Sequence, residues 1–226
     1  MARTKKTRAL TKAQKKDVKK LAMKVFNSQV EDKAKVFTNE NLQLFHNKPL
    51  YALSFLSDIQ QGVNTGDSDA AGGPKSTIRL GDEIRLKNIN IRFWLSNKLD
   101  RPNVMYKGVL FWYPSTIPSV TDAVVYLTQT NKMLDRYNHK VIRIIDQFIV
   151  KSTNMYLNGT EKFEHSYLAT LNKSYKNKKI TYDPNGKTPK GWNLGFAVVC
   201  YDAFGTLQTD NIASFAYQSK ITFEDA

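Results

Sequence analysis

The chain has 226 residues, 41% of them hydrophobic and 24% charged, which suits one domain, or one domain with a tail, and excludes global disorder. Lys and Arg number 34 against 20 Asp and Glu, so the net charge is +14, which indicates a polyanionic partner. The single cysteine, Cys200, excludes an internal disulfide, and the three separated histidines exclude a Cys/His zinc cluster within the chain.

Neither a secretory signal nor a membrane helix is expected. Residues 1–24 have no apolar core of the kind that a signal peptide needs. The longest apolar run, residues 196–201, is far shorter than the roughly 20 residues that cross a bilayer. We therefore expect no insertion into a membrane.

The positive charge is concentrated at the start of the chain. Residues 1–24 carry ten basic side chains and a single acidic one, Asp17, whereas the other 202 residues carry 24 basic and 19 acidic side chains. The net charges are +9 and +5, which predicts a basic arm, residues 1–37, followed by a nearly balanced domain. The basic residues of the arm are Arg3, Lys5, Lys6, Arg8, Lys12, Lys15, Lys16, Lys19, Lys20 and Lys24.

The arm divides into two parts. Residues 1–10 have no apolar periodicity and are expected to be disordered when unbound. Thr11 and Gln14 fit a capping box, and apolar residues then recur at helical spacing with most lysines on the opposite side. We therefore predict an amphipathic helix over residues 12–26. Its apolar face is formed by Val18, Leu21, Ala22, Val25 and Phe26.

The arm is predicted to bind nucleic acid electrostatically, with an affinity that falls steeply as the salt concentration rises. Its almost purely positive charge favours this function over a tail that only aids solubility, because solvation needs no bias of sign. A membrane-surface helix is disfavoured, since the apolar face lacks tryptophan and the chain has no lipidation motif. A role of the same basic run in nuclear import is compatible with the sequence.

Residues 38–80 are predicted to be a connector at the start of a domain that spans residues 38–226. Residues 58–81 contain five glycines and Pro74, which interrupt regular structure. Within the connector, residues 50–56 are short and apolar and could add an edge strand.

From residue 77 onward the pattern is that of β-strands. Residues 84–95 alternate apolar and polar side chains with a one-residue slip at Asn88, which indicates a β-bulge. Residues 192–201 are nearly all apolar, which predicts a central strand buried on both faces. Residues 114–138 are predicted to form a long loop with one helical turn. Further strands are predicted at residues 103–113, 140–150, 162–171, 179–182 and 212–223, with a turn at residues 183–186.

The domain is therefore expected to be all-β. Seven or eight strands with long, uneven loops and little helix predict an antiparallel sandwich or barrel. A jelly roll fits the size of the domain, and other β-sandwiches remain open on these grounds.

A second basic cluster lies in the body of the chain. Lys173, Lys176, Lys178 and Lys179 occur within seven residues, with Tyr175 between them. Basic and aromatic residues together can grip a nucleic-acid backbone and stack a base, so these five residues are candidate secondary contacts. The favoured alternative is a charged loop tip.

Arg92 is a further candidate contact, because it shares one face of its strand with Trp94. This pair could meet nucleic acid or a neighbouring subunit, and a core position for Trp94 is equally consistent with the pattern.

No catalytic constellation is present in the sequence, so we expect neither an enzyme nor a bound cofactor or metal. Residues 186–188 end like a phosphate-binding loop, but the position of its first glycine is occupied by Thr181. The isolated histidines are expected to be packed or solvated, and Cys200 is expected to be a small core residue.

Several segments in this order resemble the capsid protein of small circular, replication-initiator-encoding single-stranded DNA viruses (CRESS-DNA viruses). The most specific of them begins the strand at residues 84–95 and has the pattern R-x-G-D-x-I-x-L. The segments read LAMKV at 21–25, LSFLSDIQQG at 53–62, RLGDEIRLKNI at 79–89, IRFWL at 91–95, VLFW at 109–112, LNK at 171–173 and ITYD at 180–183.

The resemblance implies a single eight-stranded antiparallel jelly roll, with strands named B to I, in a 60-subunit T=1 icosahedral shell. It implies self-association, a basic arm that faces inward onto a single-stranded DNA genome, and a location in the virion and, during assembly, in the host nucleus, with import factors as further partners. On this basis Ile84–Ser96 is expected to be strand B, Val104–Tyr113 strand C and Ile212–Phe223 strand I. The arm differs from the long Arg-rich arms of some members in being shorter and richer in lysine.

Two other functions fit the same features. The coat protein of a small single-stranded RNA satellite virus shares the size, the jelly roll and the basic arm. A monomeric nucleic-acid-binding β-barrel predicts one aromatic-lined groove and no assembly.

Overall fold

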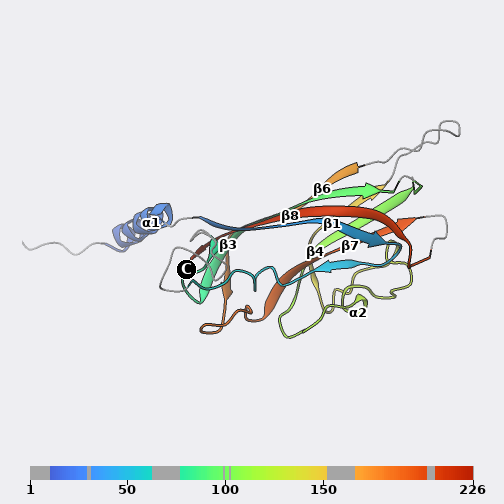
Figure 1. Cartoon of the computed structure of the whole chain (residues 1–226). Coiled ribbons are helices and arrows are strands. Elements are labelled where there is room, and N and C mark those ends of the chain that lie inside the picture. The colour runs from blue at the N-terminus through green and yellow to red at the C-terminus, as the bar shows by residue number, and fades with distance from the viewer. Residues whose placement is uncertain are drawn as a thin grey trace, which may run out of the picture. The chain divides into compact units, whose positions relative to one another are not determined.

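The structure is a computed structural model that describes residues 11–29, 32–62, 77–98, 100–101, 103–151, 166–202 and 207–225 (Figure 1). The chain forms two compact units, Met1–Asp32 and Lys33–Ala226, and each is described by itself. Arg3, Lys5, Lys6 and Arg8, together with the prediction of disorder for residues 1–10, lie outside the described residues.

The N-terminal unit contains one helix, α1, which spans Lys12–Gln29 and includes the predicted helix of residues 12–26. Its start is a capping box. The amide of Thr11 donates to Oε1 of Gln14 at 3.0 Å, and the amide of Gln14 donates to Oγ1 of Thr11 at 3.3 Å. These reciprocal bonds satisfy two amide groups that the first helical turn leaves without a partner.

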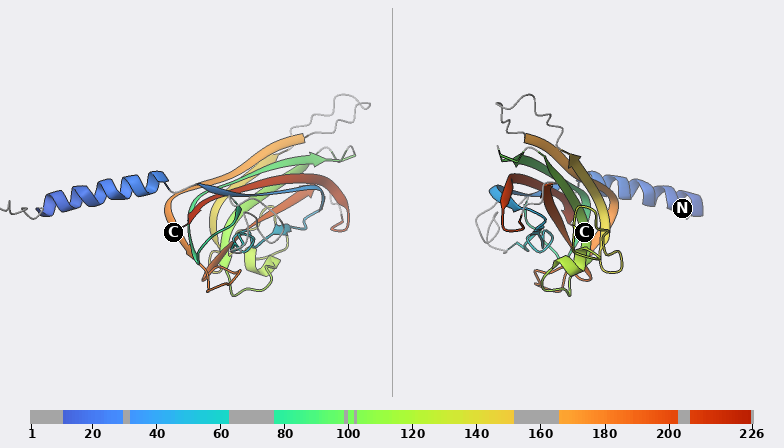
Figure 2. Two further views of the ribbon diagram at one scale, coloured as in Figure 1. Left: turned by 60° about the vertical axis from the view of Figure 1, so that its left-hand side comes forward. Right: turned by 90° about the vertical axis from the view of Figure 1, so that its right-hand side faces the viewer.

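The second unit is an antiparallel β-sandwich of two four-stranded sheets (Figure 2). One sheet has the order β1-β8-β3-β6 and the other has the order β2-β7-β4-β5. The chain therefore crosses between the sheets at every connection except that from β4 to β5, as in an eight-stranded jelly roll. The expected all-β jelly roll is thus confirmed. The elements are β1 (Lys33–Phe45), β2 (Leu50–Ala52), β3 (Glu83–Asn97), β4 (Val104–Pro114), α2 (Asp122–Val125), β5 (Arg143–Lys151), β6 (Ser166–Thr181), β7 (Trp192–Asp202) and β8 (Asn211–Asp225).

The predicted connector is wrong at its start, because β1 begins at Lys33 and pairs with β8 along its length. A register shift between Asn39 and Leu42 interrupts this pairing, and Asn41 takes a positive φ of 57°. The bulge breaks the alternation of apolar and polar side chains, which hid the strand from the sequence pattern. The expected edge strand within residues 50–56 exists as β2.

Two strand names implied by the resemblance are also wrong. Because β1 and β2 precede it, Ile84–Ser96 lies in the third strand and is not strand B, and Val104–Tyr113 lies in the fourth and is not strand C. Ile212–Phe223 lies in the last strand, β8, as expected for strand I. The predicted bulge at Asn88 is present as a register shift between Leu86 and Asn88.

The main core lies between the two sheets. Phe93 of β3 and Phe196 of β7 meet there edge to face, with ring centroids 5.0 Å apart. A second, smaller core lies on the outer face of the β2-β7-β4-β5 sheet, where Val109 and Phe111 pack against Val125 and Tyr137 from the segment between β4 and β5. Strands β4 and β7 are therefore buried on both faces, which explains the nearly continuous apolar sequence of β7.

Candidate nucleic-acid interface

The lysines of α1 form a dense, exposed basic surface. Lys12, Lys15, Lys16, Lys19 and Lys20 are all exposed. Several of them lie four residues apart on one side of the helix, where like charges destabilise it by roughly 0.2–0.5 kcal/mol per pair. The first turn of α1 contains no acidic residue and the last turn contains no basic residue, so charged side chains at its ends do not stabilise the helix through its dipole. A polyanion would relieve this repulsion and stabilise the helix.

The opposite side of α1 is apolar and exposed. Val18, Leu21 and Val25 are exposed to 52%, 62% and 55%. The described side chains of α1 therefore divide into a basic side and an apolar side, and the amphipathic role of the helix stays a prediction. The side chains of Lys24 and Phe26, which were assigned to its two faces, lie outside what the structure describes.

The second basic cluster lies on a strand and not at a loop tip, so the favoured alternative is wrong. The predicted strands at residues 162–171 and 179–182 are parts of one strand, β6, of which residues 162–165 lie outside the described part. Pairing with β3 holds Lys173, Lys178 and Lys179 opposite Ile89, Leu86 and Arg85. Cross-strand pairing thus overrides the low β-propensity of lysine and asparagine.

These lysines do not all point into solvent. Nζ of Lys178 lies 4.7 Å from the ring centroid of Trp112, and Nζ of Lys179 pairs with Oε1 of Glu83 at 2.6 Å. Tyr175 is half-buried and packs against the main core, where its hydroxyl accepts a hydrogen bond from Nε1 of Trp112 at 3.2 Å. Burial raises the pKa of Tyr175. Lys173 and Lys176 are exposed.

Arg92 and Trp94 both lie on the outer face of the β1-β8-β3-β6 sheet, and both are exposed. Trp94 does not occupy a core position, because 58% of its surface is accessible. Phe93 and Leu95, the residues on either side of it, point inward and are fully buried. Trp94 is the only Phe, Tyr or Trp side chain that is exposed in the described part of the chain.

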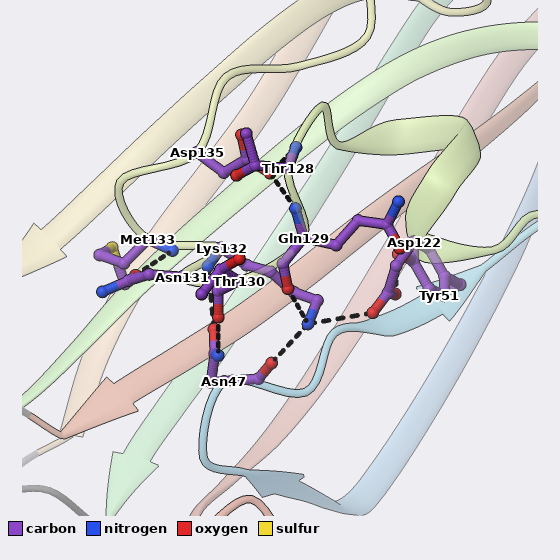
Figure 3. Close-up of polar contacts among 10 residues, drawn as sticks. All are labelled: Asn47, Tyr51, Asp122, Thr128, Gln129, Thr130, Asn131, Lys132, Met133 and Asp135. Carbon is purple, nitrogen blue, oxygen red and sulfur yellow. Dashed lines mark hydrogen bonds and ion pairs between the residues drawn. The ribbon is translucent and has the colours of Figure 1, made fainter.

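Sequence reasoning missed two buried lysines that organise the long loop between β4 and β5. Nζ of Lys132 donates to the carbonyl oxygens of Asn47 and Gln129 at 3.1 and 3.2 Å and pairs with Asp122 at 3.0 Å (Figure 3). The other oxygen of that carboxylate accepts a hydrogen bond from the hydroxyl of Tyr51 at 2.6 Å. The Lys132 side chain thereby ties the turn before β2 to the loop.

Lys107 has the same role from β4. Its Nζ donates to the carbonyl oxygens of Lys132, Met133 and Asp135 at 3.2, 3.3 and 2.7 Å, and it lies 4.6 Å from the ring centroid of Tyr137. Burial lowers the pKa of Lys107, although Asp135 opposes this. The signal in the sequence was a single lysine within an apolar strand, which indicates a charge with dedicated partners.

The carboxylate of Asp135 completes the loop. Its oxygens accept hydrogen bonds from the amides of Thr128, Gln129 and Arg136 at 2.9, 2.7 and 2.8 Å. Burial opposes ionisation of Asp135, but these amide donors outweigh it and lower its pKa. The loop between β4 and β5 is therefore held in place by charged groups that have partners within the protein.

Cys200 and His46 pack in the interior. Cys200 is fully buried, and burial raises the pKa of its thiol. Nδ1 of His46 accepts a hydrogen bond from the amide of Asp202 at 3.2 Å, and burial lowers the pKa of His46.

The described residues hold no group of three or more His, Cys, Asp or Glu side chains placed to bind a metal ion. No helix in the described ranges has the length and hydrophobicity of a membrane span.

Comparisons with known proteins give only distant similarity. No protein-family profile and no curated protein matches the sequence. The solved structure of Desmodium yellow mottle tymovirus is 11% identical, with 87% of this chain and 88% of that chain covered and a TM-score of 0.36. An empty head of turnip yellow mosaic virus is 9% identical, with 87% and 82% covered and a TM-score of 0.33. This similarity is too low to assign the chain to a family.

Proposed function

We propose that the protein is a viral coat protein that assembles into a closed 60-subunit T=1 shell and packages a circular single-stranded DNA genome through its basic arm. The observation that carries the proposal is an eight-stranded jelly roll, with the sheet orders β1-β8-β3-β6 and β2-β7-β4-β5, in a chain that begins with a separate lysine-rich helix. The sequence resemblance to CRESS-DNA virus capsid proteins supports the same function.

The charge of the arm suits packaging. Sixty copies of a segment with a net charge of +9 place hundreds of positive charges in one shell, which would offset much of the charge of a packaged genome. Lysines that contact phosphates do not read sequence, so one arm can bind whatever genome is enclosed. Arg3, Lys5, Lys6, Arg8 and Lys24 are proposed to act together with the exposed lysines of α1.

Self-association requires apolar surface outside the core. Leu127 and Leu134 are exposed to 53% and 81% on the loop that Lys107 and Lys132 hold in place, and Ile149 is exposed to 58% on the edge strand β5. Exposed apolar side chains on rigid segments are suited to subunit contacts. The same assembly places the protein in the virion, and the basic arm is a candidate signal for import factors of the host nucleus.

The proposal is tested by density-gradient sedimentation and electron microscopy of the full-length protein, with the ratio of absorbance at 260 and 280 nm and with nuclease treatment. We expect closed shells that contain DNA. A variant in which Lys15, Lys16, Lys19 and Lys20 are changed to Gln, here called the arm variant, is expected to assemble but to lose most of its nucleic acid.

The outcomes separate the alternatives. Particles whose nucleic acid is removed by ribonuclease after disruption would identify an RNA coat protein. A monomer of 25.8 kDa at every salt and protein concentration, with or without single-stranded DNA, would exclude the coat function and leave a monomeric nucleic-acid-binding domain. An arm variant that retains its full content of nucleic acid would place packaging in the β-sandwich.

A further inference from the structure

The two sheets differ in whether their outer faces are covered. The outer face of the β2-β7-β4-β5 sheet is covered by the second core described above. On the β1-β8-β3-β6 sheet, Trp94 and Leu168 lie directly opposite each other on β3 and β6 and are exposed to 58% and 85%. An exposed tryptophan at the centre of a sheet leaves a large apolar surface in water, which marks an interaction site.

The backbone that carries Trp94 is held in place by both neighbouring strands and by the core beneath it. Its strand, β3, pairs with β8 on one side and β6 on the other, and Phe93 is fixed in the core against Phe148 and Phe196 at centroid distances of 5.3 and 5.0 Å. Side chains of β8, including Ala216 opposite Trp94, complete the surface. A ligand that stacks on the Trp94 ring therefore orders little of the protein when it binds.

Two hollows flank Trp94, and their linings combine apolar surface with hydroxyl and amide groups. One is lined by Asn41, Ser96 and Ser214, and the other by Thr38, Arg92 and Gln218, with Trp94, Ala216 and Glu40 shared by both. Among the described residues, Glu40 is the only carboxylate that lines either hollow. Hydroxyl and amide groups beside an aromatic ring can bind the edges of a base and the sugar, as on sheets that bind single-stranded nucleic acid.

Positive charge lies next to the ring. Arg92 is two residues from Trp94 on the same face, about 7 Å along the strand, which is close to the length of one extended nucleotide. Lys220 of β8 lies opposite Asn90, one step further along this face. A base stacked on Trp94 therefore places its phosphate within reach of Arg92, and the next phosphate continues toward Lys220.

Charge distinguishes this face from the centre of a protein interface, because such centres are depleted of charged residues. Here the outward-pointing apolar residues that line the hollows are Trp94, Leu168 and Ala216, and they are bordered by Arg92, by Glu40 and by neutral polar side chains.

We propose that the outer face of the β1-β8-β3-β6 sheet is a second nucleic-acid site, in which a base of a single strand stacks on Trp94 and its phosphate binds Arg92. The inference rests on the proposed packaging function, and it adds an aromatic contact to the electrostatic contacts of the arm. It assigns the stacking role to Trp94 and not to Tyr175, whose ring packs against the core.

The test uses the unassembled full-length chain and a single-stranded oligonucleotide of deoxythymidine, with intrinsic tryptophan fluorescence and affinity measured across a salt titration. Stacking is expected to quench the fluorescence of Trp94, and Trp94→Phe is expected to abolish this quenching. Trp94→Ala is expected to weaken binding at least about fivefold without changing the slope of log affinity against log salt. Arg92→Ala is expected to reduce that slope by about 0.7.

Leu207→Ala and Arg136→Ala are the matched controls, since both side chains are exposed on connecting loops, the first between β7 and β8 and the second between β4 and β5. Unchanged quenching in Trp94→Phe, or equal losses of affinity in the controls, would overturn the proposal. Retained binding by Trp94→Ala together with a loss of shells on a gradient would show that the face contacts another subunit. Quenching by the oligonucleotide in a protein that forms no shells would retain the site and refute the coat function.

Discussion

The same side chain, lysine, has opposite functions in the two units of this protein. On α1, Lys15, Lys16 and Lys19 are exposed, and their mutual repulsion destabilises the helix that carries them. In the β-sandwich, Lys107 and Lys132 are buried, and their ammonium groups donate to carbonyl oxygens of the loop between β4 and β5. Charge that is left without protein partners is available to a polyanion, whereas charge with dedicated partners stabilises the fold.

The largest effect is expected on the stability of the β-sandwich. Lys107→Ala removes the donor to three buried carbonyl oxygens, and we expect it to lower the free energy of unfolding by about 3 kcal/mol. Urea denaturation measures this loss. Lys48→Ala, at an exposed position, is the control and is expected to change stability by less than about 0.5 kcal/mol. Equal stability of the two variants would contradict a structural role for Lys107.

The next effect is expected on DNA affinity. The arm variant is expected to bind a deoxythymidine oligonucleotide on the order of a hundredfold more weakly at about 0.1 M salt, and to lower the salt slope by about 0.7 for each lysine removed. Its urea midpoint should not change. The matched control carries four Lys→Gln changes at exposed positions of the β-sandwich, and a comparable loss of affinity there would show that only total charge matters. The control positions are Lys48, Lys98, Lys140 and Lys187.

A smaller effect concerns the stability of α1 itself. Because its lysines repel one another, circular dichroism should show a gain of helix when the oligonucleotide binds. Thr11→Ala removes the side-chain cap at the amide of Gln14 and is expected to cost about 1 kcal/mol of helix stability. Lys20→Ala is the control, since it removes a repulsion and not a cap. A helical signal that is the same with and without oligonucleotide would show that the helix needs no counter-charge.

The smallest effect is expected from His46. Its pKa in the folded state is below 6.5, so the unfolded state binds more protons between that pKa and 6.5. Stability is therefore complete above pH 6.5 and falls as the pH drops from 6.5 toward the folded pKa, by at most about 1.4 kcal/mol per pH unit. His46→Gln should reduce this dependence in urea titrations at several pH values. The control is His139→Gln, at an exposed position. An unchanged dependence in His46→Gln would exclude His46 as its source.

Local patterns predicted the parts of the molecule that local interactions determine. The capping box of Thr11 and Gln14, the bulge at Asn88 and the apolar strand β7 follow from residue types at short spacing. The pattern failed where pairing partners are distant in sequence. Strand β1 carries a bulge and is recognised only through its pairing with β8, and β6 is a strand because β3 holds it.

The candidate site likewise has one part that the sequence predicted and another part that it did not. The basic arm was evident from charge alone, because the sign and density of its side chains need no tertiary contact to be recognised. From the sequence, a core position, a subunit contact and a nucleic-acid contact were all compatible with Trp94, because alternation along a strand does not show which face of the sheet is covered. For the two buried lysines the sequence offered a signal only at Lys107, which is a lone lysine within an apolar strand, and none at Lys132.

The sequence by itself therefore determined the all-β class, the amphipathic helix and the position of the positive charge, because these depend on periodicity and composition. Only the tertiary structure decided which sheet face remains open, which aromatic ring is exposed and which lysines are buried. These three features depend on contacts between segments that are far apart in the chain. The loop between β4 and β5, for example, covers the outer face of the β2-β7-β4-β5 sheet, whereas Trp94 on the other sheet is exposed.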